Sequence, residues 1–135
     1  MGRCEQQQAM PGTLKEPDRE VDALATVVVE DWVTFGGLAG VAQFVRVGES
    51  AFVAAGAGCE RDVPPFVVVQ GDRARVRGVN VVGLRRRDVP EESIRALKSA
   101  VHRLWGSGET YAAALERVAG EGDPWVRRLV RALGG

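Results

Sequence analysis

A six-residue repeat between residues 27 and 63 constrains the fold of this chain more than any other feature of the sequence. Bulky apolar residues recur every six positions, and small or β-branched residues follow four positions after each of them. The first series consists of Val29, Phe35, Val41, Val47, Val53 and Cys59. The second series consists of Val33, Ala39, Val45, Ala51, Ala57 and Val63. An α-helix, with about 3.6 residues per turn, would scatter such a repeat around its circumference, so the segment is not helical.

The repeat predicts a parallel β-helix. Each group of six residues would form one short strand and a corner, and three groups would close one triangular coil. The first series would point into the interior, and the second would pack beneath the corners. Gly36 and Gly48 follow the first series and suit tight backbone geometry. The alternative is an antiparallel sandwich with accidental spacing. Six consecutive matches in both series favour the β-helix.

The repeat loosens after the paired prolines Pro64 and Pro65, which fix φ and remove two backbone donors. The valines that follow, from Val67 to Val81, predict a last extended coil and its exit. Residues 1–22 are polar and aperiodic, with two prolines, and this predicts a disordered tail. Together these features predict that residues 23–84 form β-helix coils and an exit loop.

The C-terminal third of the chain has a helical pattern. Three helices are expected, beginning at Pro90, after Thr110 and after Asp123, because a proline and two good N-caps precede runs with apolar residues on one face. Glycines follow each run. We therefore expect residues 85–135 to form a small helical domain.

Composition narrows the function classes. The formal net charge is zero, so the chain as a whole gives no case for nucleic acid or a membrane surface as partner. Cys4 and Cys59 form no CxxC motif, and the expectation is no metal and no cofactor. No apolar run approaches the roughly 18 residues of a membrane span, and no signal peptide is recognisable, so we expect a cytoplasmic protein.

A run of arginines is the clearest candidate for a binding site in the sequence. Between residues 73 and 87 there is no acid, and there are six arginines: Arg73, Arg75, Arg77, Arg85, Arg86 and Arg87. The first three alternate with small apolar residues and would share one face of an extended segment. This run is either a solvated surface or a site for phosphate or for an acidic protein, since the arginine fork matches phosphate oxygens. The single histidine, His102, has no partner in sequence and is expected on the surface or in packing.

Three stretches carry a resemblance to a known family. They are "GGLAGVAQFVRVG", "DVPPFVVVQGDRA", and "RGVNVVGLRRR" followed by "EESIRALKSAVHRLW". The chain resembles the acyl-carrier-protein–UDP-N-acetylglucosamine O-acyltransferases of lipid A biosynthesis, from about Ala23 through the first helix and more loosely to Gly135. The resemblance implies a left-handed parallel β-helix with a C-terminal helical domain, assembled as a homotrimer with active sites between subunits. It also implies transfer of a 3-hydroxyacyl chain from acyl carrier protein to the sugar 3-hydroxyl of the UDP-sugar.

The resemblance also implies roles for single residues. The backbone N–H of Ala25 would stabilise the oxyanion, and Ala55 would stand at the position that limits acyl length, favouring a shorter chain than glycine would. Substrate would be bound by Gln43, Asn80, Arg86 and Arg87. The acidic carrier protein would dock on Arg73, Arg75, Arg77 and Arg85.

Two departures from the family pattern lead us to expect that this chain is inactive alone. The family's general-base histidine lies upstream of Thr26, where this chain reads "CEQQQAM", and Thr26 and Ala42 replace further histidines. Loss of a general base lowers a rate by about 10²–10⁴-fold. From Ala23 to Val63 only a little over two coils are expected. The chain is therefore interpreted as a truncated or diverged relative; the alternatives are a non-catalytic trimeric module that binds acyl carrier protein, or a gene remnant.

Overall fold

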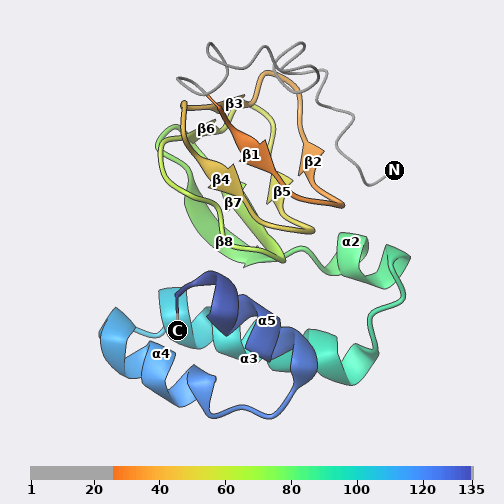
Figure 1. Cartoon of the computed structure of the whole chain (residues 1–135), viewed down its shortest axis with the longest axis vertical. Coiled ribbons are helices and arrows are strands. Elements are labelled where there is room, and N and C mark those ends of the chain that lie inside the picture. Colours follow the sequence, from red (N-terminus) through yellow and green to blue (C-terminus); the bar gives the residue numbers. More distant parts are fainter. Residues whose placement is uncertain (1–25, 135) are drawn as a thin grey trace.

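The computed structural model describes residues 26–134, so the predicted tail (residues 1–22) and Ala25 lie outside the described residues. Figure 1 shows short strands stacked at one end of the molecule and helices packed across the other. The strands are β1 (Val28–Val29), β2 (Thr34–Phe35), β3 (Gly40–Val41), β4 (Arg46–Val47), β5 (Phe52–Val53), β6 (Gly58–Cys59), β7 (Val67–Gln70) and β8 (Arg75–Val79). The helices are α2 (Val81–Arg86), α3 (Glu91–Trp105), α4 (Tyr111–Ala119) and α5 (Pro124–Ala132).

Strands from successive coils pair in parallel and form three faces. These are β1 with β4, β3 with β6, and β2 with β5 and then β7. Thr34 lies beside Phe52 and Gly40 beside Gly58, so one coil takes three groups of six residues. The parallel coils predicted from the repeat are confirmed, and the antiparallel sandwich is wrong. Among residues 26–134 the antiparallel pair is β7 with β8, where the chain leaves the coils.

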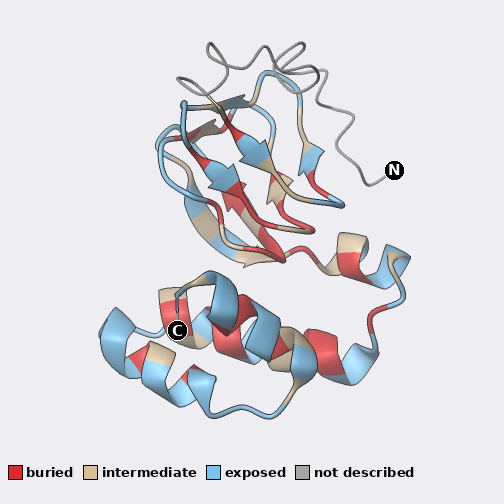
Figure 2. Cartoon of the chain, in the orientation of Figure 1, coloured by how far each residue is buried: buried red, intermediate tan, exposed pale blue. Residues whose placement is uncertain are grey.

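The side chains of both apolar series point into the interior of the triangular stack of coils, which we call the prism. In the second coil Val47, Val53 and Cys59 of the first series are buried, and their counterparts Val29, Phe35 and Val41 in the first coil are half-buried and pack against the same core. The second series supplies a buried residue beneath each corner, and only Ala39 among its members is more than slightly exposed. Figure 2 shows this buried column continuing from the coils toward the helices.

The corners of the prism use left-handed backbone at residues that are not glycine. Trp32, Leu38, Phe44 and Ser50 have φ of 64°, 60°, 68° and 58°, again at intervals of six. Such a conformation costs an L-residue about 1–2 kcal/mol. It turns the corner amide toward the coil above, where Ser50 N donates to Asp31 O at 3.0 Å and Phe44 N to Thr26 O at 2.9 Å.

The two glycines singled out in the sequence are required by the stacking of coils. A Cβ on Gly36 would lie 2.5 Å from Ala55 N, and one on Gly48 would lie 2.6 Å from Pro65 N. Both atoms belong to the backbone of the coil below and cannot move aside. Neither glycine has positive φ, so close approach rather than conformational freedom explains them.

The coils shorten where the prolines interrupt the repeat. Val47 lies beside Val63 and Phe52 beside Val68, two residues fewer than in the regular coil. After β7 the chain turns back as β8 and enters α2. The expected extension to Val81 is therefore wrong at its end, because Val81 begins a helix that was not predicted.

The three predicted helices are present as α3, α4 and α5. The side chain of Thr110 accepts a hydrogen bond from Ala113 N, and that of Asp123 accepts from Trp125 N and Val126 N, as N-caps do. Gly106 and Gly120 end α3 and α4 as expected. The helices continue the core of the coils: Phe66 is fully buried and meets the Trp125 ring edge-on, with centroids 5.7 Å apart.

Candidate functional site

Asn80 fixes the position of the arginine triplet at residues 85–87. It is 5% exposed, and its Oδ1 accepts from Gly83 N at 3.1 Å, which caps α2. Its Nδ2 donates to the backbone oxygen of Ser50 at 2.9 Å, in a corner of the second coil. A Cβ on Gly83 would collide with the Asn80 side chain. The predicted substrate residue Asn80 therefore ties the start of α2 to the prism.

The three arginines that end α2 have different surroundings. Arg85 makes a two-pronged pair with Glu91, with Nε–Oε2 at 2.8 Å and Nη2–Oε1 at 3.0 Å. This hydrogen bonding, with the charge attraction, raises the pKa of Arg85 and lowers the pKa of Glu91. Arg86 is exposed, and no hydrogen bond or ion pair holds it among residues 26–134. Arg87 is 14% exposed and enclosed.

Arg87 lies in a group of side chains that we call the corner cluster: Trp32, Glu49, Arg87, Trp125 and Arg128. Arg87 Nη1 donates to Glu49 Oε2 at 3.2 Å and to Ser50 Oγ at 2.7 Å. Its guanidinium carbon lies 5.1 Å from the ring centroid of Trp32 and 5.2 Å from that of Trp125. The cation is thus held between an indole of the first coil and an indole of α5.

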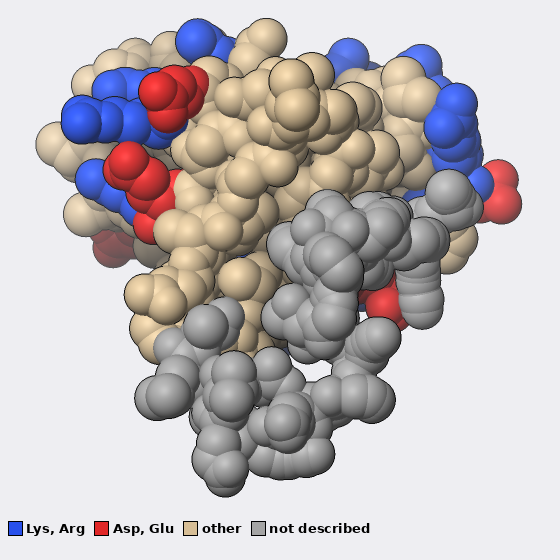
Figure 3. Space-filling model, turned by 90° about the horizontal axis from the view of Figure 1, so that it is seen from above, with Lys and Arg blue, Asp and Glu red and all other residues tan. Residues whose placement is uncertain are grey.

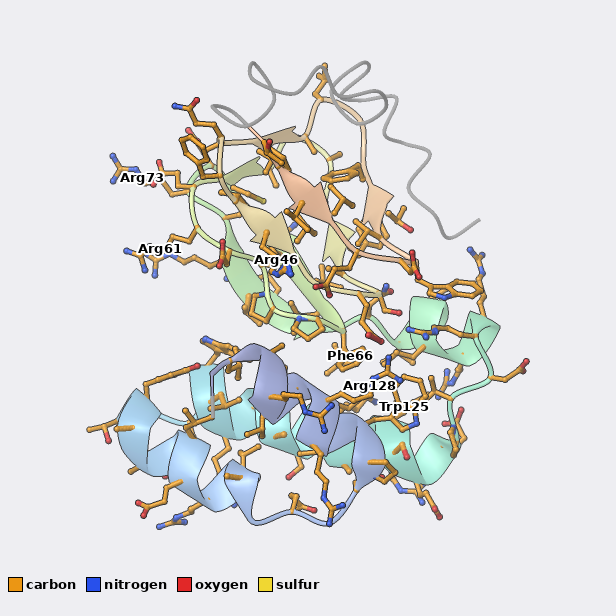
Figure 4. The ribbon with its side chains drawn as sticks, viewed as in Figure 1. Arg46, Arg61, Phe66, Arg73, Trp125 and Arg128 are labelled. Carbon is orange, nitrogen blue, oxygen red and sulfur yellow. The ribbon has the colours of Figure 1, made fainter. Side chains whose placement is uncertain are left out.

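Glu49 also forms an ion pair with a second arginine, Arg128 of α5. Arg128 Nη2 donates to both oxygens of Glu49 at 2.6 Å, and its guanidinium carbon lies 4.7 Å from the Trp125 centroid. Figure 4 shows Arg128, Trp125 and Phe66 gathered at the junction of coils and helices. One carboxylate with two arginines and two indoles therefore joins the prism to α2 and α5. Of these five residues only Arg87 was singled out from the sequence.

Gln43, predicted to bind substrate, and Ala55, predicted to limit the length of the acyl chain, lie at other corners. Gln43 is exposed in the corner between β3 and β4, and Ala55 is exposed in the corner between β5 and β6, beside Gly36 of the coil above. Asn80 and Arg87 contact Ser50 in the corner between β4 and β5. One chain therefore does not bring Gln43 and Ala55 together with Asn80 and Arg87.

The four arginines predicted to dock a carrier protein do not form one patch. Arg75 and Arg77 share the exposed face of β8, as predicted. Arg73 precedes that strand with φ of 71° and lies 3.8 Å from Glu60. Arg73 projects on one side of the molecule, while α2, which carries Arg85, lies on the other (Figures 1 and 4). Figure 3, seen from above, shows basic side chains spread along the left, upper and right edges of the molecule rather than gathered in one patch.

Other candidate chemistry is sparse in the part of the chain that the structure describes. Residues 26–134 hold no group of three or more histidine, cysteine or acidic side chains that would bind a metal ion. None of their helices has the length and apolar character needed to cross a membrane. His102 is exposed on α3, and burial raises the pKa of the Cys59 thiol inside the prism.

Comparison with known proteins identifies a family for this chain. The family model described as "Udp N-acetylglucosamine O-acyltransferase; Domain 2" matches residues 62–134. An acyl-[acyl-carrier-protein]–UDP-N-acetylglucosamine O-acyltransferase from Burkholderia lata is 39% identical over 110 residues, which cover 77% of this chain and 42% of that protein. The protein of the same name from Burkholderia mallei is 37% identical over the same share of both chains.

Solved structures agree with the sequence relatives. The UDP-N-acetylglucosamine acyltransferase of Arabidopsis gives a TM-score of 0.74 at 30% identity, over 80% of this chain and 40% of that one. LpxA from Acinetobacter baumannii gives a TM-score of 0.73 at 27% identity, over 80% of this chain and 43% of that one. This chain therefore spans less than half the length of the relatives that it matches.

Proposed function

The chain belongs to the UDP-N-acetylglucosamine O-acyltransferase family, and on that premise we propose that it serves lipid A biosynthesis, in the transfer of a 3-hydroxyacyl chain from acyl carrier protein to UDP-N-acetylglucosamine. The observation that carries the proposal is the family match over residues 62–134, which includes β8, α2 and all of the corner cluster except Trp32 and Glu49. In this proposal the coils are left-handed, the C-terminal helices form a domain of their own, and the chain assembles as a homotrimer.

The distribution of residues over the corners supports a site between subunits. Gln43, Ala55 and the pair of Asn80 and Arg87 lie at three different corners, so a site that contains all of them needs residues from neighbouring copies. In such an assembly Arg86 binds the phosphate-bearing substrate directly, Asn80 and Arg87 fix the end of α2 that carries Arg86 beside it, and Gln43 contacts the substrate from the neighbour. Ala55 limits the length of the acyl chain. Arg86 is the arginine of the triplet with its N–H groups free for a ligand among the described residues.

The chemistry requires a base, a role that the family resemblance assigns to a histidine. The sugar hydroxyl attacks the thioester carbonyl, loses its proton, and the carrier thiol leaves. The single histidine, His102, lies exposed on α3, outside every corner that holds a predicted substrate residue. We infer that this chain by itself binds and positions substrates without turning them over at the family's rate, since a missing base lowers a rate about 10²–10⁴-fold.

An acyl-transfer assay tests this proposal. The purified chain is incubated with 3-hydroxyacyl-loaded carrier protein and UDP-N-acetylglucosamine, next to a full-length relative. We expect saturable binding of the UDP-sugar, weakened by Arg86→Gln, and product formation at least a hundredfold below that of the relative. Turnover equal to that of the relative would refute the inactivity of this chain. No binding of the UDP-sugar or the carrier protein would refute the proposed function altogether.

The second candidate is a non-catalytic module that binds acyl carrier protein. The observation in its favour is that Arg75 and Arg77 are exposed and without an ion pair among the described residues. Carrier protein should be retained by the immobilised chain and released by salt. Retention lost in Arg75→Gln/Arg77→Gln, without UDP-sugar binding, would favour the module over the transferase. Failure to melt cooperatively would instead indicate a gene remnant that does not fold.

A further inference from the structure

A groove of about 630 Å³ lies between the loop of residues 60–64, strand β8 and the end of helix α3. It is on the side of the molecule where Arg61 and Arg73 project (Figure 4), away from α2 and the corner cluster. Arginine side chains line both sides of the groove, with Arg61 on the loop and Arg75 and Arg77 on the strand. No residue expected to bind the UDP-sugar lines it.

The acids of the groove are already engaged. Glu60 lies 3.8 Å from Arg73, and Asp62 Oδ1 accepts a hydrogen bond from Arg46 N at 2.9 Å. Arg61, Arg75 and Arg77 have no ion pair within residues 26–134. The lining holds four arginines and two acids, an excess of two positive charges in a chain whose net charge is zero. Because neighbouring like charges repel, an anion in the groove would stabilise this arrangement.

The shape and lining of the groove narrow the class of anion. Arg75 and Arg77, two residues apart on one face of a strand, have Cα atoms about 7 Å apart, and Arg61 lines the same groove from the loop, so three guanidinium groups are available to one anion. A tetrahedral phosphate offers several oxygens to arginine forks, whereas a carboxylate offers two. The groove is larger than a bare phosphate needs and is also lined by Val63, Val69 and Trp105.

We propose that this groove binds an organic phosphate, with Arg61, Arg75 and Arg77 on the phosphate oxygens and the apolar part of the ligand against Trp105. The site lies away from α2 and the corner cluster and one coil below the corner that holds Gln43, and the proposal does not depend on acyl transfer. It also differs from a carrier-protein dock, because it requires a tetrahedral anion with an attached apolar group rather than a broad acidic surface.

Calorimetric titration of the whole chain at fixed ionic strength tests the proposal with three probes: phenyl phosphate, inorganic phosphate and phenol. Phenyl phosphate should bind more tightly than inorganic phosphate, because the ring contacts Trp105, and phenol should not bind measurably. Arg75→Gln/Arg77→Gln should weaken phenyl phosphate binding at least about tenfold, since each lost charged hydrogen bond weakens binding by roughly that factor. Arg61→Gln alone should weaken it less.

A matched control variant distinguishes binding in the groove from nonspecific attraction of the anion to positive charge on the protein. Arg127→Gln/Arg131→Gln removes two exposed arginines of α5 and gives the same net charge. It should leave phenyl phosphate binding unchanged. Equal weakening in both double variants, or equal affinity for phenyl phosphate and inorganic phosphate, would overturn the proposal. Binding of carrier protein to this face without any binding of phenyl phosphate would also overturn it and assign the arginines to a protein surface.

Discussion

Two regions of this molecule hold arginines in opposite ways. In the corner cluster, Arg87 and Arg128 share the carboxylate of Glu49 and lie against tryptophan rings. In the groove beside β8, Arg75 and Arg77 project from an exposed strand with no ion pair among the described residues. The first arrangement stabilises the junction of coils and helices, and the second leaves cations available to a ligand. Proximity in sequence therefore does not give the arginines between residues 73 and 87 one role.

The largest expected effect is the difference in stability between two variants, each of which lacks one arginine from one of the two regions. Arg87→Ala should lower the free energy of unfolding by about 2–4 kcal/mol, because it leaves Ser50 Oγ and part of Glu49 unpaired and removes the cation between two indoles. Arg75→Ala should change it by less than about 0.5 kcal/mol, as exposed substitutions do. Urea unfolding of both variants gives the comparison. Equal losses would show that the two regions do not differ as the structure indicates.

Glu49→Gln should have an intermediate effect. The amide keeps the volume of Glu49 but leaves two guanidinium groups facing a neutral oxygen, and a loss of about 1–2 kcal/mol is expected because the pair is only partly exposed. The double variant Glu49→Gln/Arg128→Gln should be more stable than Glu49→Gln, because it removes one of the two guanidinium groups that the single variant leaves without a carboxylate partner. Thermal unfolding of the single and double variants measures the coupling.

Glu60→Gln is the matched control in the groove. Glu60 is 62% exposed and lies 3.8 Å from Arg73, so its loss should change stability by less than about 0.5 kcal/mol. It should also strengthen phenyl phosphate binding, since one more arginine becomes available. A stability loss like that of Glu49→Gln would contradict the distinction between the two regions.

The features that could be predicted from the sequence are those set by local pattern. A period of six fixes which side chains face the interior, and the N-caps Thr110 and Asp123 mark helix starts by their own hydrogen bonds. Helix α2 was missed because its first residues, Val81, Val82 and Gly83, are poor helix formers. Its start depends on Asn80 bonding to Ser50, thirty residues away.

The corner cluster was missed for the same physical reason. Glu49 is 38 residues from Arg87 and 79 residues from Arg128, and no periodic pattern connects the three. Their contacts exist only once the helices have packed under the coils. The basic run was recognised, but its division into engaged and free arginines depends on acids that lie outside it, at Glu49, Glu60 and Glu91. The roles proposed for Gln43 and Ala55 stay predictions.

The smallest expected effect on stability concerns Arg85. This residue is exposed, like the arginines of the groove, but it is paired with an acid, like those of the corner cluster. Its hydrogen bonds to Glu91, together with the charge attraction, lower the pKa of that carboxyl in the folded protein. The stabilisation from the pair is therefore complete above the ordinary carboxyl pKa and is lost as the pH falls through the lowered pKa of Glu91. Because both side chains are exposed, salt should screen most of it.

A carboxyl titration followed by NMR measures this pair directly. The midpoint for Glu91 should be lower in the unaltered protein than in Arg85→Gln, and high salt should bring the two midpoints together. Arg86→Gln is the matched control and should leave the Glu91 midpoint nearly unchanged, because Arg86 does not contact Glu91 in the structure. Identical midpoints in the unaltered protein and in Arg85→Gln would mean that Arg85 is as free in solution as Arg75 and Arg77. The basic surface available to an acidic partner would then include α2 as well as the groove.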